Sequence, residues 1–242
     1  MQYFIDFPLT QYYFGDEKKS VITTDLSAYV SVIDNFKDAV AFYNEYYIRE
    51  NERPDQLAFK LYDDPSLHWT FYAMNDNIRE RGWPLTNREI NLKIEKDFPD
   101  YVLVTKTEIA NKFKIGQTIS GKTSAATGTI SHRNIDLGQL TLTNTSGTFT
   151  AGEVIESTNA NGFSETILCS SYSSETLAVH HYENASGEWV DIDPTVGPGA
   201  LYSAVTNTDY YISKNDELKE IRIIKPSSII EVIDAFKEAL KN

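Results

Sequence analysis

A repeat in the middle of the chain limits what that part can fold into. Residues 113–119 (FKIGQTI) and 149–155 (FTAGEVI) share a Phe, a Gly and an Ile, and each of the three is displaced by 36 positions, from 113 to 149 for the Phe. Each copy is followed by a stretch rich in Ser, Thr, Gly and Asn and then by a β-branched run, at 128–130 and 165–168. Short strands separated by Gly and Asn turns predict a small all-β module. Two copies are too few for a solenoid, so a compact pseudo-symmetric unit is favoured.

Composition changes at both ends of this segment. Residues 1–104 are rich in Tyr, Phe, Asp and Glu, whereas residues 105–174 are rich in Thr, Ser, Gly, Asn and Ile and carry few charges. The earlier character returns in residues 175–242. A foreign middle between two similar flanks predicts a β-rich module at 105–174, inserted in a loop of a body that is built from 1–104 and 175–242.

The flanks predict an α+β fold. Pro54 at a first helical turn predicts a helix that ends at the Asp63-Asp64-Pro65 break, followed by a second helix over about 66–75. Thr86 with Glu89 three residues on is a capping-box pattern for a third helix, to about residue 97.

Further elements are expected at both ends of the body. Residues 42–48 predict a strand, and residues 29–43 have helical spacing but stay ambiguous. Residues 179–182 and 189–190 predict a hairpin around Ser186-Gly187. A strand at 218–224 is followed by Pro226 and by an amphipathic helix after Ser228.

Charge and cysteine content exclude several classes of function. The net charge of -13 disfavours DNA or RNA binding, because a polyanion gains nothing by releasing counterions from nucleic acid. The one cysteine, Cys169, cannot form an intrachain disulfide. No stretch approaches ~18 consecutive apolar residues, and residues 1–9 do not resemble a signal peptide. We therefore expect no membrane partner and folding in a cytoplasm.

Motifs for chemistry are missing from the sequence. None of the four histidines stands in a metalloprotease motif, and the adjacent His180 and His181 are expected to point to opposite faces of a strand. Asp191 and Asp193 could hold a divalent ion with a phosphate but are interpreted as ordinary loop carboxylates. No nucleophile elbow, phosphate loop or dinucleotide fingerprint is present. We expect no enzyme activity, no cofactor and no metal.

The most informative stretch lies between residues 46 and 85. In order it contains YYIRENERPDQLA at 46–58, LYDDP at 61–65, LHW at 67–69, NDN at 75–77 and WPL at 83–85. These motifs predict a strand, a helix, a break, a second helix, an Asn-rich turn and a closing segment. The arrangement resembles a LysM-like unit, at about residues 44–86, in which two helices pack on a two-stranded sheet.

The same series resembles the baseplate wedge protein 53 family of T-even-type contractile-tailed phages. The C-terminal run at 217–224 with its following helix, and the hairpin at Ser186-Gly187, are similar to features of that family. The inserted β module departs from the family's pattern, and its role is open.

The resemblance implies a structural subunit of a tail baseplate wedge. Such a protein would join neighbouring wedges and contact the inner baseplate ring around the tail tube, in a large hetero-oligomer of the virion that is assembled in the host cytoplasm. Candidate interface residues are the aromatics and the polar turn of the LysM-like unit: Tyr62, Trp69, Asn75, Asp76, Asn77 and Trp83. A core position is favoured for Trp69, and contact for the turn residues.

Two rival functions are open. A LysM-type peptidoglycan-binding module of a phage tail or cell-wall protein is the first, since LysM units often recognise N-acetylglucosamine polymers. A cell-wall hydrolase is the second, and it would need a pair of acidic residues in a cleft.

Overall fold

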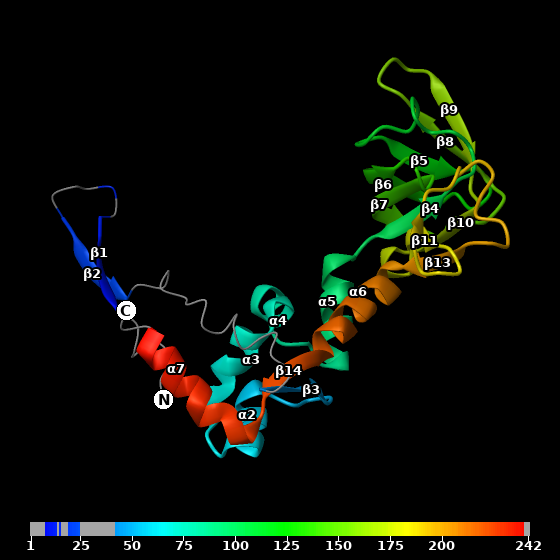
Figure 1. Ribbon diagram of the computed structural model, residues 1–242. Coiled ribbons are helices and arrows are strands. Elements are labelled where there is room, and N and C mark those ends of the chain that lie inside the picture. Colours follow the sequence, from blue (N-terminus) through cyan, green and yellow to red (C-terminus); the bar gives the residue numbers. More distant parts are fainter. Residues whose placement is uncertain (1–7, 14, 16–18, 25–41, 240–242) are drawn as a thin grey trace. The chain divides into compact units, whose positions relative to one another are not determined.

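The computed structural model describes residues 8–13, 15, 19–24 and 42–239, which form an α+β protein (Figure 1). The chain divides into two compact units: Met1–Asn87 together with Lys214–Asn242, called unit 1, and Arg88–Ser213, called unit 2. The ambiguous helical spacing at 29–43 falls almost wholly outside the described residues. A short antiparallel hairpin, β1 (Leu9–Tyr12) with β2 (Val21–Thr24), lies in the N-terminal part of the chain.

Unit 1 is built on a two-stranded antiparallel sheet whose strands come from distant parts of the sequence. Strand β3 (Tyr43–Tyr47) pairs with β14 (Glu220–Ile224), so that Tyr47 lies opposite Glu220. Both predicted strands are confirmed. The partner of β3 nevertheless lies outside residues 44–86, where the LysM-like resemblance placed the whole unit. That resemblance remains a prediction.

Four helices accompany this sheet in the described part of unit 1. They are α2 (Pro54–Tyr62), α3 (Trp69–Met74), α4 (Asp76–Arg81) and α7 (Ile229–Ala239). Asp63 ends α2 in the left-handed conformation (φ 55°), and a 3-10 turn, Pro65–His68, leads into α3. The expected Asn-rich turn at 75–77 is wrong. Asn75 is a single extended residue between two helices, and Asp76 and Asn77 begin α4, where an acidic side chain complements the helix dipole.

The helices and the sheet of unit 1 enclose two clusters of buried apolar side chains. One cluster contains Ile48, Leu57, Ala58, Phe71, Ile78, Leu218, Ile221 and Ile223. The other contains Leu67, Trp69, Ala73, Met74, Ile224, Ile229, Val232 and Phe236. The predicted apolar stripe of the last helix, Ile229, Val232, Ile233, Phe236 and Leu240, is confirmed over its described part. Ile229, Val232 and Phe236 are buried and Ile233 packs against them, while Leu240 lies outside the described residues.

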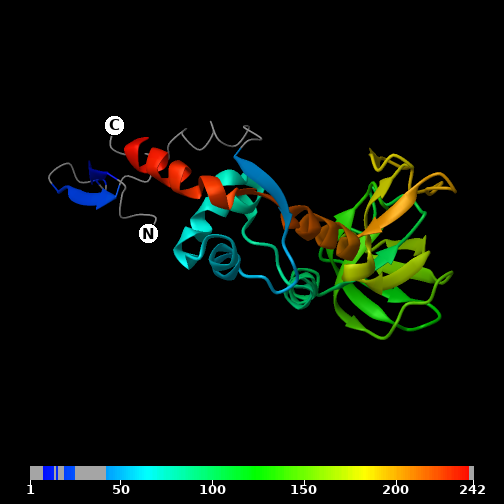
Figure 2. The ribbon, with the colours of Figure 1, turned by 60° about the horizontal axis from the view of Figure 1, so that its bottom comes forward.

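Unit 2 contains a seven-stranded antiparallel sheet in the order β10-β4-β7-β6-β5-β8-β9, seen from a second direction in Figure 2. Its strands are β4 (Tyr101–Val104), β5 (Thr118–Gly121), β6 (Thr127–Asn134), β7 (Gln139–Ser146), β8 (Val154–Thr158), β9 (Ser164–Leu168) and β10 (Ser171–Ser174). Strands β10 and β9 form the two edges of this sheet, and β4 lies between β10 and β7. The sheet therefore extends beyond the predicted module at 105–174, because β4, which precedes residue 105, pairs with β7 and with β10.

The two sequence repeats pair with each other about a local pseudo-twofold axis. Strands β5 and β8 are antiparallel, and Ser120 lies opposite Glu156, its own equivalent 36 positions on. The shared Phe and Ile residues of both copies are buried, at Phe113 and Ile119 and at Phe149 and Ile155. The pseudo-symmetric arrangement expected from the repeat thus has a direct structural counterpart.

A second, three-stranded sheet of unit 2 holds the predicted hairpin. Strand β11 (Val179–Glu183) pairs with β12 (Trp189–Val190) and with β13 (Ser203–Thr206). The expectation that His180 and His181 face opposite ways is wrong. A bulge at His180 shifts the register, and the two Nδ1 atoms lie 2.9 Å apart.

Two helices complete unit 2. They are α5 (Asn87–Asp97), with the bounds that the capping box predicted, and α6 (Asn207–Asp216). The rings of Phe98 and Tyr211 pack edge to face at 5.3 Å.

Candidate contact surface of unit 1

Trp69 and Tyr62, two of the six predicted interface residues, pack against the apolar clusters of unit 1. Trp69 is buried, with its ring 4.8 Å from that of Phe236. The Tyr62 hydroxyl donates a hydrogen bond to the Ile224 carbonyl at 2.9 Å, and burial raises the pKa of this phenol well above its ordinary value. Tyr62 therefore ties α2 to β14, and Trp69 packs α3 against α7. A core position was favoured for Trp69 from the sequence.

Asn75 is also buried, and its side chain ties the helix junction to the sheet. Its Nδ2 donates to the carbonyls of Phe71 and Arg222, both at 2.8 Å, while its Oδ1 accepts from the Arg222 amide at 2.7 Å. Two of these hydrogen bonds join the α3–α4 corner to the middle of β14, and the third joins Asn75 to α3.

Trp83 is half-buried and closes the other side of the helix pair. Its Nε1 donates to the Glu52 carbonyl at 2.8 Å. Its ring lies 5.9 Å from Phe71 and 6.0 Å from Tyr72. The residue fastens the loop after β3 to α3.

Asp76 and Asn77 are the predicted residues that reach the surface. Asp76 is exposed and pairs with Arg79 at 2.8 Å, one helical turn on. Asn77 is half-buried and lines a groove of about 520 Å³ between the start of α4 and the sheet.

This groove brings together side chains that sequence reasoning did not group. It is lined by Glu45, Tyr46, Tyr47, Asn75, Asn77, Glu220, Ile221 and Arg222. The two adjacent tyrosines at the end of β3, a strand of mixed polarity, were the sequence feature that could have indicated this groove. The sequence did not show that β3 pairs with β14. Across the pair, Glu45 lies opposite Arg222 and Tyr47 opposite Glu220. The groove therefore contains two tyrosine side chains, with carboxylates and a guanidinium group around them.

A carboxylate fixes the loop beside the groove. Glu52 accepts hydrogen bonds from the Tyr46 hydroxyl at 2.8 Å, the Arg49 amide at 3.1 Å and Lys60 Nζ at 3.2 Å. Burial raises the pKa of Glu52, but these hydrogen bonds outweigh it and leave the pKa below its ordinary value. Glu52 thus stays ionised and keeps Tyr46 in place.

The described residues offer little for catalysis or metal binding. Within them, no group of three or more His, Cys, Asp or Glu side chains is arranged to hold a metal ion. The buried thiol of Cys169 has a pKa raised to about 11, because burial and the nearby Glu153 disfavour the thiolate. None of the helices that the structure describes has the length and apolar character needed to cross a bilayer.

The fold and the groove define a mixed α+β protein with a polar and aromatic contact surface on its smaller sheet. Residues 4–91 match the family model described as base plate wedge protein 53. A stretch of 59 residues is 41% identical to the baseplate wedge protein gp53 of Enterobacteria phage T4. That stretch covers 23% of this chain and 30% of the T4 protein, so the chain matches less than a third of its relative's length. The resemblance expected from the motifs is confirmed over this part of the chain.

Proposed function

We propose that the chain is a structural, non-catalytic subunit of a phage tail baseplate wedge. The observation that carries the proposal is the coincidence of the family match with the groove. Residues 4–91 include β3, α2, α3 and α4, and supply five of the eight residues that line it. The segment most similar to a wedge protein is therefore the segment that builds the contact surface.

The groove has the chemistry of a protein interface. Tyr47 is 56% exposed and offers a large apolar body with a polar tip, a residue type enriched at interface centres. Glu45, Glu220 and Arg222 surround it with both signs of charge, which fixes the register of a partner more than it adds affinity. Asp76 and Asn77 extend this surface onto α4.

The contact surface is also held in one shape before a partner arrives. The two hydrogen bonds between Asn75 and Arg222 fix the start of α4 relative to β14, and Glu52 fixes Tyr46. A preorganised surface loses less conformational entropy on binding. In this proposal the surface joins neighbouring wedges and contacts the inner ring around the tail tube, and the protein is assembled in the host cytoplasm and retained in the virion tail.

The decisive experiment is assembly with purified wedge subunits from the same phage. The variant Tyr47→Ala should weaken co-assembly by tenfold or more, since truncation of a central anchor costs roughly 2 kcal/mol. Phe59→Ala is the matched control, because Phe59 is 57% exposed, lies on α2 of the same unit and does not line the groove. Equal assembly by both variants would count against this surface, and failure of the unaltered chain to assemble would refute the role.

The LysM-type alternative is separated by a pull-down on purified peptidoglycan. If unit 1 serves as a protein contact, replacing Tyr47 by Ala should leave the amount of chain retained on peptidoglycan unchanged. Retention that depends on Tyr47 would instead favour a cell-wall-binding module. Hydrolysis of the same peptidoglycan would show that the chain is an enzyme.

A further inference from the structure

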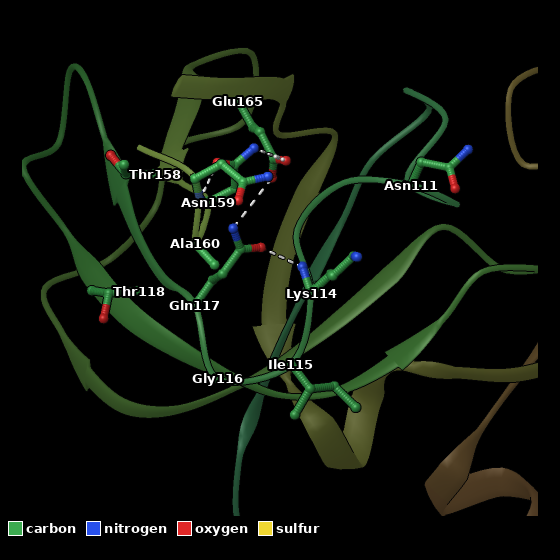
Figure 3. A pocket seen from close by; sticks show the side chains of 11 residues that line it. Asn111, Lys114, Ile115, Gly116, Gln117, Thr118, Thr158, Asn159, Ala160 and Glu165 are labelled. Atoms are coloured by element: carbon green, nitrogen blue, oxygen red, sulfur yellow. Dashed lines mark hydrogen bonds between the residues drawn. The ribbon is translucent and has the colours of Figure 1, made fainter. Parts of the chain in front are cut away.

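Unit 2 has a cavity of about 830 Å³ that the wedge role does not use. It lies between the loop that leads into β5 and the turn between β8 and β9, and is lined by Asn111, Lys114, Ile115, Gly116, Gln117, Thr118, Thr158, Asn159, Ala160, Asn161 and Glu165 (Figure 3). Its volume is within the range of roughly 300–1,000 Å³ that is typical of small-molecule sites.

The cavity arises from a difference between the two repeats. Gln117 and Glu153 are equivalent, 36 positions apart, and each accepts a hydrogen bond from the amide three residues earlier, of Lys114 or of Thr150. Glu153 also accepts from the amides of Thr123 and Ser124, so the loop after β5 closes over it.

The equivalent loop after β8 does not close over Gln117. Asn159 Oδ1 accepts the amides of Asn161 and Phe163, both at 3.0 Å, so this turn satisfies its donors internally. Because those amides are engaged within the turn, space remains between the turn and Gln117, and this space is the cavity.

A central carboxylate holds both walls of the cavity in place. Glu165 accepts from the Phe113 amide at 2.8 Å and from Gln117 Nε2 at 3.4 Å on one side, and from Asn159 Nδ2 at 3.1 Å on the other. Figure 3 shows Gln117, Asn159 and Glu165 turned toward one another. The frame is therefore preorganised, and the charge of Glu165 is already hydrogen-bonded from both walls.

Four neutral polar side chains remain around this frame. Those of Asn111, Thr118, Thr158 and Asn161 line the cavity and make no hydrogen bond within the described chain. Carboxamides and hydroxyls both donate and accept, which matches the hydroxyl groups of a sugar, each of which also does both. Ile115, 63% exposed, adds an apolar wall suited to the C–H face of a pyranose.

The lining of the cavity favours neither a charged nor a strongly apolar ligand. Lys114 and Glu165 are its charged residues and cancel formally, so neither an anion nor a cation is favoured overall. The apolar side chains of the lining are those of Ile115 and Ala160, and they offer too little apolar surface to bind a lipid or an aromatic ligand. We propose that this cavity is a binding site for an uncharged, hydroxyl-rich saccharide, held by Asn111, Thr118, Thr158 and Asn161.

The test uses the full chain, labelled with ¹⁵N, because the side-chain amide resonances of Asn and Gln report the site directly. Maltotriose, cellotriose, mannotriose and triacetylchitotriose are each added at about 10 mM, enough to fill most of a site whose Kd is about 1 mM. We expect at least one of them to shift the amides of Asn111, Asn159, Asn161 or Gln117. No shift with any of the four would overturn the proposal.

Variants separate binding at this site from binding elsewhere. The double variant Asn111→Ala/Asn161→Ala removes two free carboxamides without removing a hydrogen bond of the fold, and should weaken binding at least about fivefold. Asn91→Ala, an exposed position on α5 of the same unit, is the control and should bind as the unaltered chain does. An unchanged affinity in the double variant would refute the site. A saccharide that shifts only the resonances of Asn75 and Asn77 would bind in unit 1, and this result would also refute the site in unit 2. The wedge proposal would be unaffected, because it is tested separately by the assembly experiment.

Discussion

The two units differ in how far apart in the sequence their paired strands lie. Unit 1 pairs β3 with β14, so that Tyr47 meets Glu220 across most of the chain's length. The seven strands of the larger sheet in unit 2 all lie between Tyr101 and Ser174, and neighbours in the sequence often pair directly. Bringing β3 and β14 together costs the conformational entropy of closing a long loop, which the contacts within unit 1 must offset. The strands of unit 2 pair over shorter separations in the sequence, so the fold of unit 2 is specified more locally.

The difference predicts separate responses to damage in the two cores. The largest effect is expected for Phe236→Ala, which leaves a cavity beside Trp69 and should destabilise unit 1 by about 3–5 kcal/mol. Ile230→Ala, at a 71% exposed position of the same helix, is the control. Thermal unfolding followed by NMR should show loss of the unit 1 signals at lower temperature while the unit 2 signals stay. Simultaneous loss of both sets would show that the units do not unfold separately.

The repeat of unit 2 offers a matched pair of substitutions. Ile119→Ala and Ile155→Ala remove equivalent buried side chains on β5 and β8, and each should destabilise unit 2 by about 2–5 kcal/mol. Denaturant unfolding of the two variants should give similar midpoints. A large difference would mean that the sequence repeat does not produce equivalent packing.

The corner that joins α3, α4 and β14 should be the most sensitive polar point of unit 1. Asn75→Ala removes three hydrogen bonds, one to the Phe71 carbonyl and two to the Arg222 backbone, so a loss of about 1–3 kcal/mol is expected. Asn77→Ala, on the neighbouring surface, should cost less. Chemical denaturation at neutral pH measures both. Equal stability of the two variants would contradict the role assigned to Asn75.

A smaller, pH-dependent effect is expected at Glu52. Its pKa is lowered in the folded state, so its contribution is present above the ordinary value of 4.5 and is lost as the pH falls through the lower folded value. The size should be about 1 kcal/mol or less, as for other partly exposed ion pairs. Stability measured from neutral pH to pH 3 should therefore fall less in Glu52→Gln than in the unaltered chain. If stability falls equally with pH in both proteins, Glu52 does not contribute to the pH dependence.

The smallest effect on unit 1 is expected from removing unit 2 altogether. Asn215 exchanges two hydrogen bonds with the backbone of Leu85, at 2.8 and 2.9 Å, so the chain enters and leaves unit 2 at adjacent points of unit 1. A short Gly-Ser linker from Asn87 to Lys214 should keep unit 1 folded with cooperative unfolding. Loss of cooperativity would show that the two units form one domain. A deletion limited to 105–174 should do worse, because it leaves β4 without β7 and β10.

Local pattern was enough for many elements of the fold. Pro54, the Asp63-Asp64-Pro65 break and the Thr86 capping box set helix ends through short-range sterics and hydrogen bonding, and α2 and α5 have the expected bounds. The repeat of Phe, Gly and Ile predicted a β module with internal symmetry, because buried positions must recur where strands do. The match of residues 4–91 followed from motifs that are likewise local.

Other features could be decided only by the tertiary structure. Asn is a residue type that is common in turns, yet Asn75 is buried. Its side-chain amide forms hydrogen bonds with the backbone of Arg222 on β14, 147 positions further along the chain. His180 and His181 share one side of their strand because of a bulge that alternation cannot foresee. The groove of unit 1 needs two strands from opposite ends of the chain, and the cavity of unit 2 needs a loop that satisfies its own donors. Sequence pattern specifies which residues are buried within an element, whereas the pairing of distant elements is set by the three-dimensional packing that creates both sites.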